Sequence, residues 1–387
     1  MKMNWRSPAH ILWLALSVIS VVIAFPFSML PRRGGGRRRI ILTGHKLNGN
    51  LWAFYRFLQD QNEYGCAFLT MDFRYYRELR SRHVPALFLG NPLHVIAVAT
   101  SGIAISDHGP GLLRPLAVAG RLKLVDVWHG IPFKGYSAAS FAHVHPVDEV
   151  WVTSEHVAKI HTQQFGFRPE QVRRTGYARA DALVNDTTDR ALILERLGIE
   201  DRFAAVVTFA PTWKQDDIDR DIFPFGLSGD GFFAGLNRLG ERHNVLFIFR
   251  AHLNDDASQV SEYGNIVTRS YAEHVIAEET LAITDILVTD WSSIAFDFLV
   301  TGRPTVFLDV PPPFREGFTF DGSYRTGPVV KSYEELLQRL ESFIAAPESY
   351  AAEFGAVIDR ALRDVYGDTA DGRSSERYLA AVSELTR

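Results

Sequence analysis

The sequence has one cysteine, and its first 39 positions contain no acidic residue. The lone Cys66 excludes an internal disulfide and shows no metal-ligand spacing, so a reducing compartment is the simpler interpretation and we expect Cys66 in the core. The first 39 residues carry seven Lys or Arg, so the formal net charge of −4 leaves −11 for the remainder. A body this acidic is a poor candidate for general nucleic-acid binding, which needs a basic surface.

Charge is also absent from residues 11–30, twenty mainly apolar positions. As a helix this run can cross a hydrocarbon core of about 30 Å. Pro26 and the serines leave a helix that lies on the membrane, or enters it only partly, as the alternative. Five arginines follow, and Phe25-Pro26-Phe27 offers no cleavage site, which argues against a secretory signal.

The arginines after this run predict its orientation. Because positive flanks stay in the cytoplasm, we expect a cell-membrane location with the acidic body on the cytoplasmic face, beside anionic lipid headgroups. A stop signal alone is the other explanation for the arginines.

At 387 residues and 47% apolar content, the chain is long enough for two domains and an appendage. Short apolar runs alternate with amphipathic stretches, which predicts an α/β fold of parallel strands joined by helices. We expect a membrane anchor with a basic flank at 1–38 and two doubly wound Rossmann-like domains at 39–186 and 187–387, with C-terminal helices that could pack back. The predicted strands are 40–42, 67–69, 86–89, 103–105, 124–127 and 149–152, then 205–209, 245–249, 286–288 and 305–308.

Ligands of open α/β sheets bind beyond the carboxyl ends of the strands, and this sequence places polar motifs there. The apolar run 286–288 is followed by Thr289-Asp290-Trp291-Ser292-Ser293, and Asp297 lies one turn into the helix that comes next. Ser292 or Ser293 would cap that helix, and the N–H groups of its first turn suit a phosphate or pyrophosphate. Helix capping alone also explains the motif, because capping needs no ligand.

Three more polar motifs follow predicted strands. They are Trp128-His129-Gly130-Ile131-Pro132-Phe133-Lys134, Ala210-Pro211-Thr212-Trp213-Lys214 and Arg250-Ala251-His252-Leu253. Each of these residues also has an explanation that needs no ligand. His129 could be a turn residue, the tryptophans could belong to the core, and the Lys and Arg side chains could be solvated surface charges. Together, two histidines, three cations, a threonine and a Ser-Ser helix start describe an anion site with a proton carrier, which suits phosphoryl transfer.

These motifs resemble those of the CDP-glycerol glycerophosphotransferase family, the teichoic-acid primases and polymerases. The resemblance covers about residues 40–380 and rests on the order of the motifs. It includes Gly176-Tyr177-x-Arg179-x-Asp181, Phe296-Asp297-Phe298, Arg303-Pro304-Thr305-Val306-Phe307, Arg315-Glu316-Gly317-Phe318 and Gly327-Pro328 besides those above.

The resemblance implies a GT-B-like fold in which the two domains face a cleft, with the nucleotide in the second domain and the acceptor entering from the first. It implies that an acceptor hydroxyl attacks the phosphorus of a CDP-polyol, so that CMP leaves. The polyol phosphate, glycerol phosphate foremost, would be added to a membrane-linked saccharide or polyol-phosphate chain in the synthesis of teichoic acid or a related cell-wall or capsule polymer.

The same resemblance assigns roles to single residues. His129 matches the proposed base for the acceptor hydroxyl, and His252 the histidine at the donor pyrophosphate. The residues expected to bind the CDP-polyol are Lys134, Thr212, Trp213, Lys214, Arg250, Thr289, Asp290, Ser292, Ser293 and Asp297. The serines would hold the β-phosphate, the cations would balance the phosphate oxygens, and Asp290 and Asp297 would orient a histidine or a donor hydroxyl, or act as structural partners.

No metal site is predicted, and no histidines stand at His-x-x-x-His spacing. We expect protein cations and the helix dipole to balance the phosphate charge without a required cofactor, although a loosely held Mg²⁺ would leave no trace in the sequence. Two other functions stay open. One is a nucleotide-sugar glycosyltransferase or epimerase of the same architecture, and the other is a non-catalytic membrane-bound assembly module.

Overall fold

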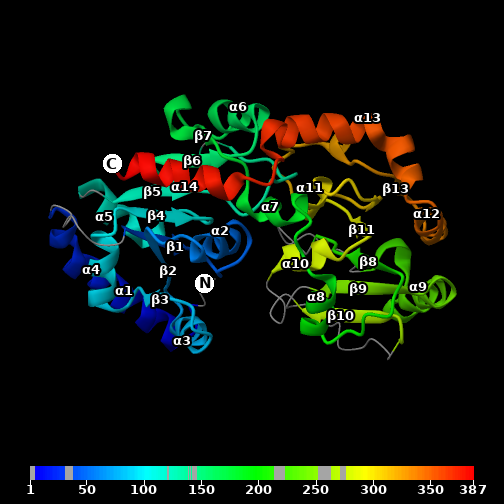
Figure 1. Ribbon diagram of the computed structural model, residues 1–387, viewed down its shortest axis with the longest axis horizontal. Helices are drawn as coiled ribbons and strands as arrows, with labels where there is room; N and C mark the ends of the chain where they lie inside the picture. Colours follow the sequence, from blue (N-terminus) through cyan, green and yellow to red (C-terminus); the bar gives the residue numbers. More distant parts are fainter. Residues whose placement is uncertain are drawn as a thin grey trace. The chain divides into compact units, whose positions relative to one another are not determined.

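The computed structural model describes residues 5–30, 38–119, 122–137, 139, 141, 146–212, 223–251, 263–270 and 276–387 (Figure 1). The chain forms two α/β units. Unit 1 consists of Met1–His129, Ser137–Asp181 and Arg373–Arg387, and unit 2 of Gly130–Tyr136 and Ala182–Gly372. The chain thus changes unit directly after Asp181, whereas the sequence placed a domain boundary at 186.

Unit 1 contains a seven-stranded sheet with the strand order β3-β2-β1-β4-β5-β6-β7. Every neighbouring pair is parallel. The strands are β1 (Arg38–Thr43), β2 (Tyr64–Thr70), β3 (Ala86–Phe88), β4 (Ile103–Ser106), β5 (Lys123–Asp126), β6 (Glu149–Val152) and β7 (Val172–Arg174). The six strands predicted for this half are confirmed, and β7 is an additional edge strand.

Helices flank the sheet of unit 1 and form most of the connections between its parallel strands. They are α1 (Pro8–Ser28), α2 (Gly49–Gln59), α3 (Phe73–Ser81), α4 (Pro92–Ala99), the 3₁₀ turn η1 (Gly111–Leu113), α5 (Arg114–Ala119), α6 (Glu155–Gln163), η2 (Pro169–Gln171), α7 (Ala178–Val184), which continues into unit 2, and α14 (Ser374–Leu385). Cys66 on β2 packs against the core of this unit.

Unit 2 contains a second parallel sheet of six strands, ordered β10-β9-β8-β11-β12-β13. The strands are β8 (Ala205–Phe209), β9 (Val245–Ala251), β10 (Ile266–Ser270), β11 (Ile286–Thr289), β12 (Thr305–Leu308) and β13 (Val329–Val330). The helices are α8 (Arg190–Arg196), η3 (Pro224–Gly226), α9 (Gly229–His243), α10 (Ala277–Ala282), α11 (Ile294–Leu299), η5 (Gly322–Tyr324), α12 (Tyr333–Ala345), α13 (Glu348–Val365) and η6 (Gly367–Thr369). The four predicted strands are confirmed, and the edge strands β10 and β13 are additional.

Among the described residues, α1 is the one helix long and apolar enough to cross a bilayer. Within unit 1 it packs along α4 and α5, and Figure 1 shows it in dark blue beside α4. Its inward face carries mostly small side chains, namely Ser17, Ser20, Val21, Ala24 and Ser28.

The C-terminal helix α14 completes the core of unit 1. Tyr378 is fully buried, with its ring edge-on to Phe54 at 5.4 Å and 4.7 Å from Trp151. The carboxylate of Asp181 accepts hydrogen bonds from the backbone N–H groups of Ser374 (2.9 Å) and Ser375 (2.8 Å). These N–H groups have no partner inside the helix, so Asp181 caps α14 from a distant part of the chain.

Replacing Asp181 by Ala is expected to lower the free energy of unfolding by about 1–2 kcal/mol, because two N–H groups at the start of α14 lose their acceptor. Hydrogen exchange should speed up over residues 374–385, which is measurable by mass spectrometry together with thermal denaturation. Asp359→Ala, which removes an exposed carboxylate of α13, is the control. Equal protection of α14 in both variants would contradict the capping role.

Candidate active site

A tight turn follows β5 and presents His129 at the carboxyl edge of the first sheet. Trp128 lies in the left-handed region with φ 49°, a conformation that costs free energy for a residue with a side chain. The side chain of Asp126 accepts a hydrogen bond from the Trp128 N–H at 2.8 Å. The buried Asn50 of α2 donates its amide hydrogens to the carbonyls of Val127 and Trp128, both at 3.0 Å. These bonds hold the turn in its strained form.

Arg179 completes this support. Its guanidinium donates to the carbonyl oxygen of His129 at 2.7 Å, and its backbone N–H donates to the Asn50 side chain at 3.1 Å. The motif that contains Gly176, Arg179 and Asp181 therefore has two structural tasks in unit 1. Arg179 positions the His129 turn and Asp181 caps α14.

The imidazole of His129 is held in one orientation. Its Nδ1 lies 3.0 Å from the backbone carbonyl oxygen of Asp107, which can only accept, so Nδ1 carries the hydrogen. In the neutral ring, Nε2 is then the nitrogen that can accept a proton. The residue as a whole is exposed, but the rings of His108 and Trp128 lie 4.3 and 4.2 Å from its imidazole and shield the imidazole from part of the solvent.

Two further histidines stand beside His129 and were not predicted. The ring of His108 stacks on His129 at 4.3 Å with an interplanar angle of 10°, and His45 lies 4.1 Å from His108. The Asp107 carboxyl forms a 2.7 Å hydrogen bond with Nδ1 of His108. Gly44 makes room for this carboxyl, because a Cβ there would come within 2.1 Å of its Oδ1.

This crowding changes the acid–base properties of the group. Desolvation lowers the pKa of His129 to about 4, with a further contribution from His108, while Asp107 and Asp126 act in the opposite direction. Desolvation and His108 also lower the pKa of His45 to about 3. Burial raises the pKa of Asp107 to about 8. His129 is therefore neutral at pH 7, the state a general base requires.

The residues directly after His129 belong to unit 2. Phe133 is buried, stacking on Phe296 of α11 at 4.4 Å and meeting Trp291 edge-on at 5.7 Å. Lys134 forms an antiparallel bridge with Phe318, and its carbonyl accepts a 2.7 Å hydrogen bond from the Thr319 hydroxyl. The backbone of Lys134 is thereby fixed, and its ammonium lies 5.9 Å from the ring of Tyr136.

Asp290 organises the carboxyl edge of the second sheet. It is fully buried after β11, and its Oδ1 accepts hydrogen bonds from the Thr212 N–H at 2.8 Å, from the Thr212 hydroxyl, and from the Trp291 N–H. Thr289 is also buried and donates its hydroxyl to the carbonyl of Ala210 at 2.7 Å. Thr212, Thr289 and Asp290 thus form one network that joins the loops after β8 and β11.

The helix start after this network differs from the expectation. Ser293 is the N-cap residue, but it has helical φ −58° and ψ −17° and makes no side-chain capping bond. Capping needs an extended backbone that turns the side chain back to the first N–H groups, so the predicted serine cap is wrong for Ser293. The hydroxyl of Ser292 accepts a long 3.5 Å contact from the Ile294 N–H. Asp297 is buried on α11.

Cations stand at the same edge of this sheet. Arg250, near the end of β9, donates a long 3.4 Å bond to the Thr280 hydroxyl. Arg325, which the sequence analysis missed, is nine-tenths buried and lies 3.5 Å above the ring of Trp291. Its Nε and one Nη have no hydrogen-bond acceptor among the described residues. Desolvation lowers the pKa of Arg325, against the influence of Asp309 and Asp290.

Three predicted site residues, Trp213, Lys214 and His252, lie outside the described residues. The structure brings Thr212, Thr289 and Asp290 together in unit 2, with Ser292 and Ser293 directly after them. Arg250 lies on β9, two strands away from β11, and His129 lies in unit 1. No group of three or more metal-binding side chains occurs in the described part of the chain.

Known proteins share both the sequence motifs and the fold described above. The family model described as CDP-Glycerol:Poly(glycerophosphate) glycerophosphotransferase matches residues 40–384. The chain belongs to this family.

Two curated relatives come from Bacillus. A teichoic acid poly(ribitol-phosphate) polymerase of Bacillus spizizenii is 28% identical over 305 residues, covering 73% of this chain and 47% of that protein. A teichoic acid poly(glycerol phosphate) polymerase of Bacillus subtilis is 28% identical over 239 residues, covering 58% of this chain and 30% of that protein. The matched regions thus cover about half or less of these relatives.

A solved structure supports the fold. The wall teichoic acid polymerase TagF superposes with a TM-score of 0.75 at 16% identity, covering 96% of this chain and 94% of that one. The chain therefore has the GT-B-like α/β fold expected from its sequence, with an apolar N-terminal helix.

The stacked His108 provides a test of the His129 environment. Replacing His108 by Ala removes a neighbour that shields the His129 ring from water and lowers its pKa electrostatically, and both changes are expected to raise the pKa of His129 from about 4 toward its usual value. The titration of the His129 ring can be followed by NMR. His83→Ala, at an exposed position after α3, is the control. An unchanged His129 titration in His108→Ala would show that the stack does not tune this ring.

Proposed function

We propose that this protein transfers a polyol phosphate from a CDP-polyol to a hydroxyl of a membrane-linked acceptor and releases CMP. The single observation that supports this most is the fixed imidazole of His129, whose Nδ1–H is bonded to the Asp107 carbonyl and whose Nε2 is left to accept a proton. Membership of the glycerophosphotransferase family gives the substrate class.

In the proposed reaction, Nε2 of His129 takes the proton of the acceptor hydroxyl as its oxygen bonds to the phosphorus that carries the polyol. The bond from that phosphorus to the bridging oxygen of the pyrophosphate breaks, and CMP leaves with the bonding electrons. Neutrality of His129 at pH 7 supports this role, because a protonated ring cannot act as a base.

The donor would bind at the carboxyl edge of the second sheet. In this proposal Thr212, Ser292 and Ser293 donate hydrogen bonds to the donor, while Lys134 and Arg250 balance its phosphate charge. Asp290 and Thr289 would support donor binding indirectly, because their hydrogen bonds hold the loops after β8 and β11 in place. Asp297, buried on α11, would act in the same indirect way.

Arg325 is the additional donor ligand that we propose from the structure. A buried guanidinium whose Nε and one Nη have no acceptor among the described residues would gain most from a phosphate oxygen. The sequence motifs add Trp213 at the nucleotide, Lys214 as a further cation that balances the phosphate charge, and His252 at the pyrophosphate. Protein cations would then balance the charge with no required metal, and a Mg²⁺ ion that bridges the phosphates is the alternative.

The acceptor and its location are proposed from the N-terminal part of the chain. We propose a lipid-linked saccharide or polyol-phosphate chain as acceptor, entering from the first domain, with the protein on the cytoplasmic face of the cell membrane. The apolar helix α1 and the arginines that follow it support this location. Glycerol phosphate is the polyol that we propose first, and the similarity to ribitol-phosphate and glycerol-phosphate polymerases makes both donors worth testing.

His129→Ala is expected to lower kcat by roughly 10²–10⁴-fold, because the proton of the acceptor hydroxyl loses its base. Binding of the CDP-polyol should change little. The assay supplies CDP-glycerol or CDP-ribitol with a lipid-disaccharide analogue, and measures CMP release and the mass of the product. His156→Ala, at an exposed position of α6, is the control. Unchanged turnover in His129→Ala would remove the base assignment, and release of a nucleoside diphosphate would indicate a glycosyltransferase.

Arg325→Gln is expected to weaken donor binding, with KM for the CDP-polyol rising by about tenfold or more, because a charge-assisted bond to phosphate is worth roughly 1.5–3 kcal/mol. Isothermal titration with CDP-glycerol measures the affinity directly. Arg360→Gln is a matched control, since Arg360 is a partly exposed arginine that lies over Tyr324. Equal affinities of the two variants would exclude Arg325 from the donor site.

A further inference from the structure

Basic side chains continue from the candidate active site along the carboxyl edge of the first sheet. The ring of His129 stacks on His108 at 4.3 Å, and His108 lies 4.1 Å from His45, which follows β1. Lys46 comes next in the chain, and its ammonium lies 3.7 Å from the centre of the Tyr75 ring on α3. The strand order β2-β1-β4-β5 explains this sequence of contacts, because all four strands are parallel and end at the same edge.

Hydrogen bonds join the loop that carries Lys46 to the first turn of α3. The Tyr75 hydroxyl accepts a 3.0 Å bond from the Leu47 N–H. The side chain of Asp72 accepts from the N–H groups of Arg74 at 2.9 Å and Tyr75 at 3.1 Å, and so caps α3. Lys46 and Arg74 are therefore held together at the edge of the sheet where His129 lies.

The helix α3 is basic, whereas most of the chain is acidic. Its exposed arginines, including the one that ends it, are Arg74, Arg77, Arg80 and Arg82. The acids beside them are engaged, since Asp72 caps the helix and Glu78 pairs with Arg82 at 3.1 Å. Among the described residues, none forms an ion pair with Lys46, Arg74 or Arg77. We call these three cations the basic row of unit 1.

The charge of the basic row favours an anionic ligand. The chain after residue 39 has a net charge of −11, so a group of unpaired cations is exceptional on this protein. Arg74 and Arg77 are one helical turn apart, and like charges at such positions destabilise a helix. A bound anion would relieve this repulsion and would form charge-assisted hydrogen bonds with the guanidinium groups.

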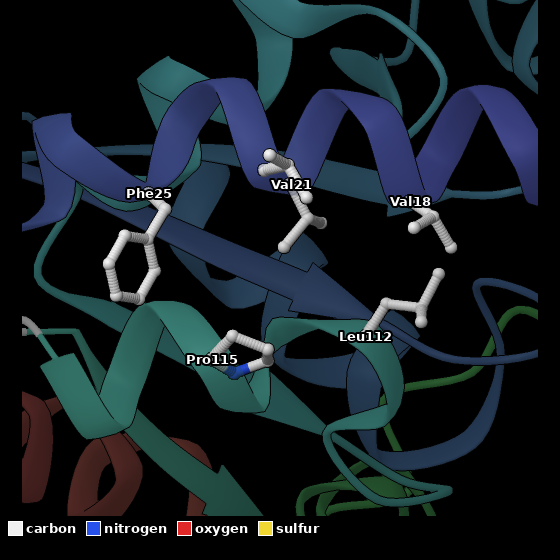
Figure 2. A pocket seen from close by; sticks show the side chains of 6 residues that line it. Val18, Val21, Phe25, Leu112 and Pro115 are labelled. Carbon is white, nitrogen blue, oxygen red and sulfur yellow. The ribbon is translucent and has the colours of Figure 1, made fainter.

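Unit 1 also has an apolar groove, which does not suit such a ligand. Figure 2 shows Val18, Val21 and Phe25 of α1 facing Leu112 and Pro115 across it. All the residues that line the groove are apolar, so no side chain there can bind a phosphate oxygen. The carboxyl edge with the basic row is the better site for an anion.

The length of this edge suits a polymer better than a single anion. Three strand spacings, or about 14 Å, separate β5, which leads to His129, from β2, which leads to α3. A polyol-phosphate chain carries one negative charge in every repeat, and one polyol separates its terminal hydroxyl from the first phosphodiester. With that hydroxyl at Nε2 of His129, the following phosphodiesters would lie along the basic row.

We propose that the basic row is an acceptor subsite, and that the acceptor is a polyol-phosphate chain of at least two units whose phosphodiesters bind Lys46, Arg74 and Arg77. The terminal hydroxyl of this chain is the one that reaches His129. The inference rests on the proposed function and chooses between its two acceptors, because an uncharged saccharide offers nothing to these cations. The protein then extends polyol-phosphate chains rather than starting them.

The length of the acceptor tests this subsite. Water-soluble acceptors carry the same saccharide and zero, one, two or three glycerol phosphates, with CDP-glycerol as donor. The value of kcat/KM should rise by about tenfold or more between zero and two units. Lys46→Gln and Arg74→Gln should each limit this rise to about threefold or less, because a charge-assisted contact is lost. Arg82→Gln, at the far end of α3, is the matched control. Equal kcat/KM for all four acceptors would overturn the proposal.

Binding measured without donor separates this inference from the proposed function. A fluorescent glycerol-phosphate tetramer should bind the full chain, and its Kd from fluorescence anisotropy should rise about tenfold in Lys46→Gln and in Arg74→Gln. Transfer that proceeds while both variants bind the tetramer like the unmodified chain would refute the subsite alone. Weakened binding in both variants, with no transfer from any CDP-polyol, would refute only the proposed function.

Lipid headgroups are another source of phosphodiesters, and vesicles test them. Flotation with phosphatidylglycerol vesicles is compared for Arg74→Gln, Arg82→Gln and the unmodified chain. Unchanged flotation of Arg74→Gln together with its weaker tetramer binding would support the acceptor subsite. Reduced flotation of Arg74→Gln with unchanged tetramer affinity would assign the basic row to headgroups and overturn the proposal.

Discussion

The strained turn after β5 is the constraint on which the candidate active site depends. Asn50 and Arg179 come from separate segments, and together they bind the carbonyls of Val127, Trp128 and His129. Their buried donors offset the left-handed backbone of Trp128, which costs about 1–3 kcal/mol in an unsupported chain. The imidazole of His129 keeps its orientation because its own backbone is fixed in this way. A proton acceptor has to meet its substrate within hydrogen-bond reach, so this rigidity is part of the chemistry.

The central strands could be predicted from the sequence, whereas of the four edge strands only β3 was predicted. Strands buried on both faces, such as β4 and β11, require continuous apolar runs, and such runs can be recognised directly in the sequence. The missed strands β7, β10 and β13 all lie at sheet edges. β7 reads Val-Arg-Arg and is half-exposed, because one side of an edge strand meets solvent and polar residues are tolerated there. Pairing with an inner strand, rather than local composition, decides that such a segment is extended.

Parts of the candidate site were predictable for a similar reason. His129, Thr212 and Asp290 follow buried strands, where ligand-binding residues of α/β sheets gather. No local sequence pattern predicts the group of His45, Asp107 and His108. This group forms only when the ends of β1 and β4 come together beside β5. Arg325 is a candidate donor ligand because it is buried against Trp291, and this contact depends on the tertiary structure rather than on the local sequence. The serine cap was predicted from residue type, but the helical backbone of Ser293 turns its side chain away from that task.

The interleaving of the two units has a consequence for how the chain folds. The polypeptide changes unit after His129, Tyr136, Asp181 and Gly372, so unit 1 includes the final segment Arg373–Arg387. That segment supplies Tyr378 to a core otherwise built from the first half of the sequence. During synthesis, an N-terminal domain usually folds while the rest is still being made. Here the core of the first sheet is complete only after all of unit 2 has been synthesised and the segment Arg373–Arg387 has left the ribosome.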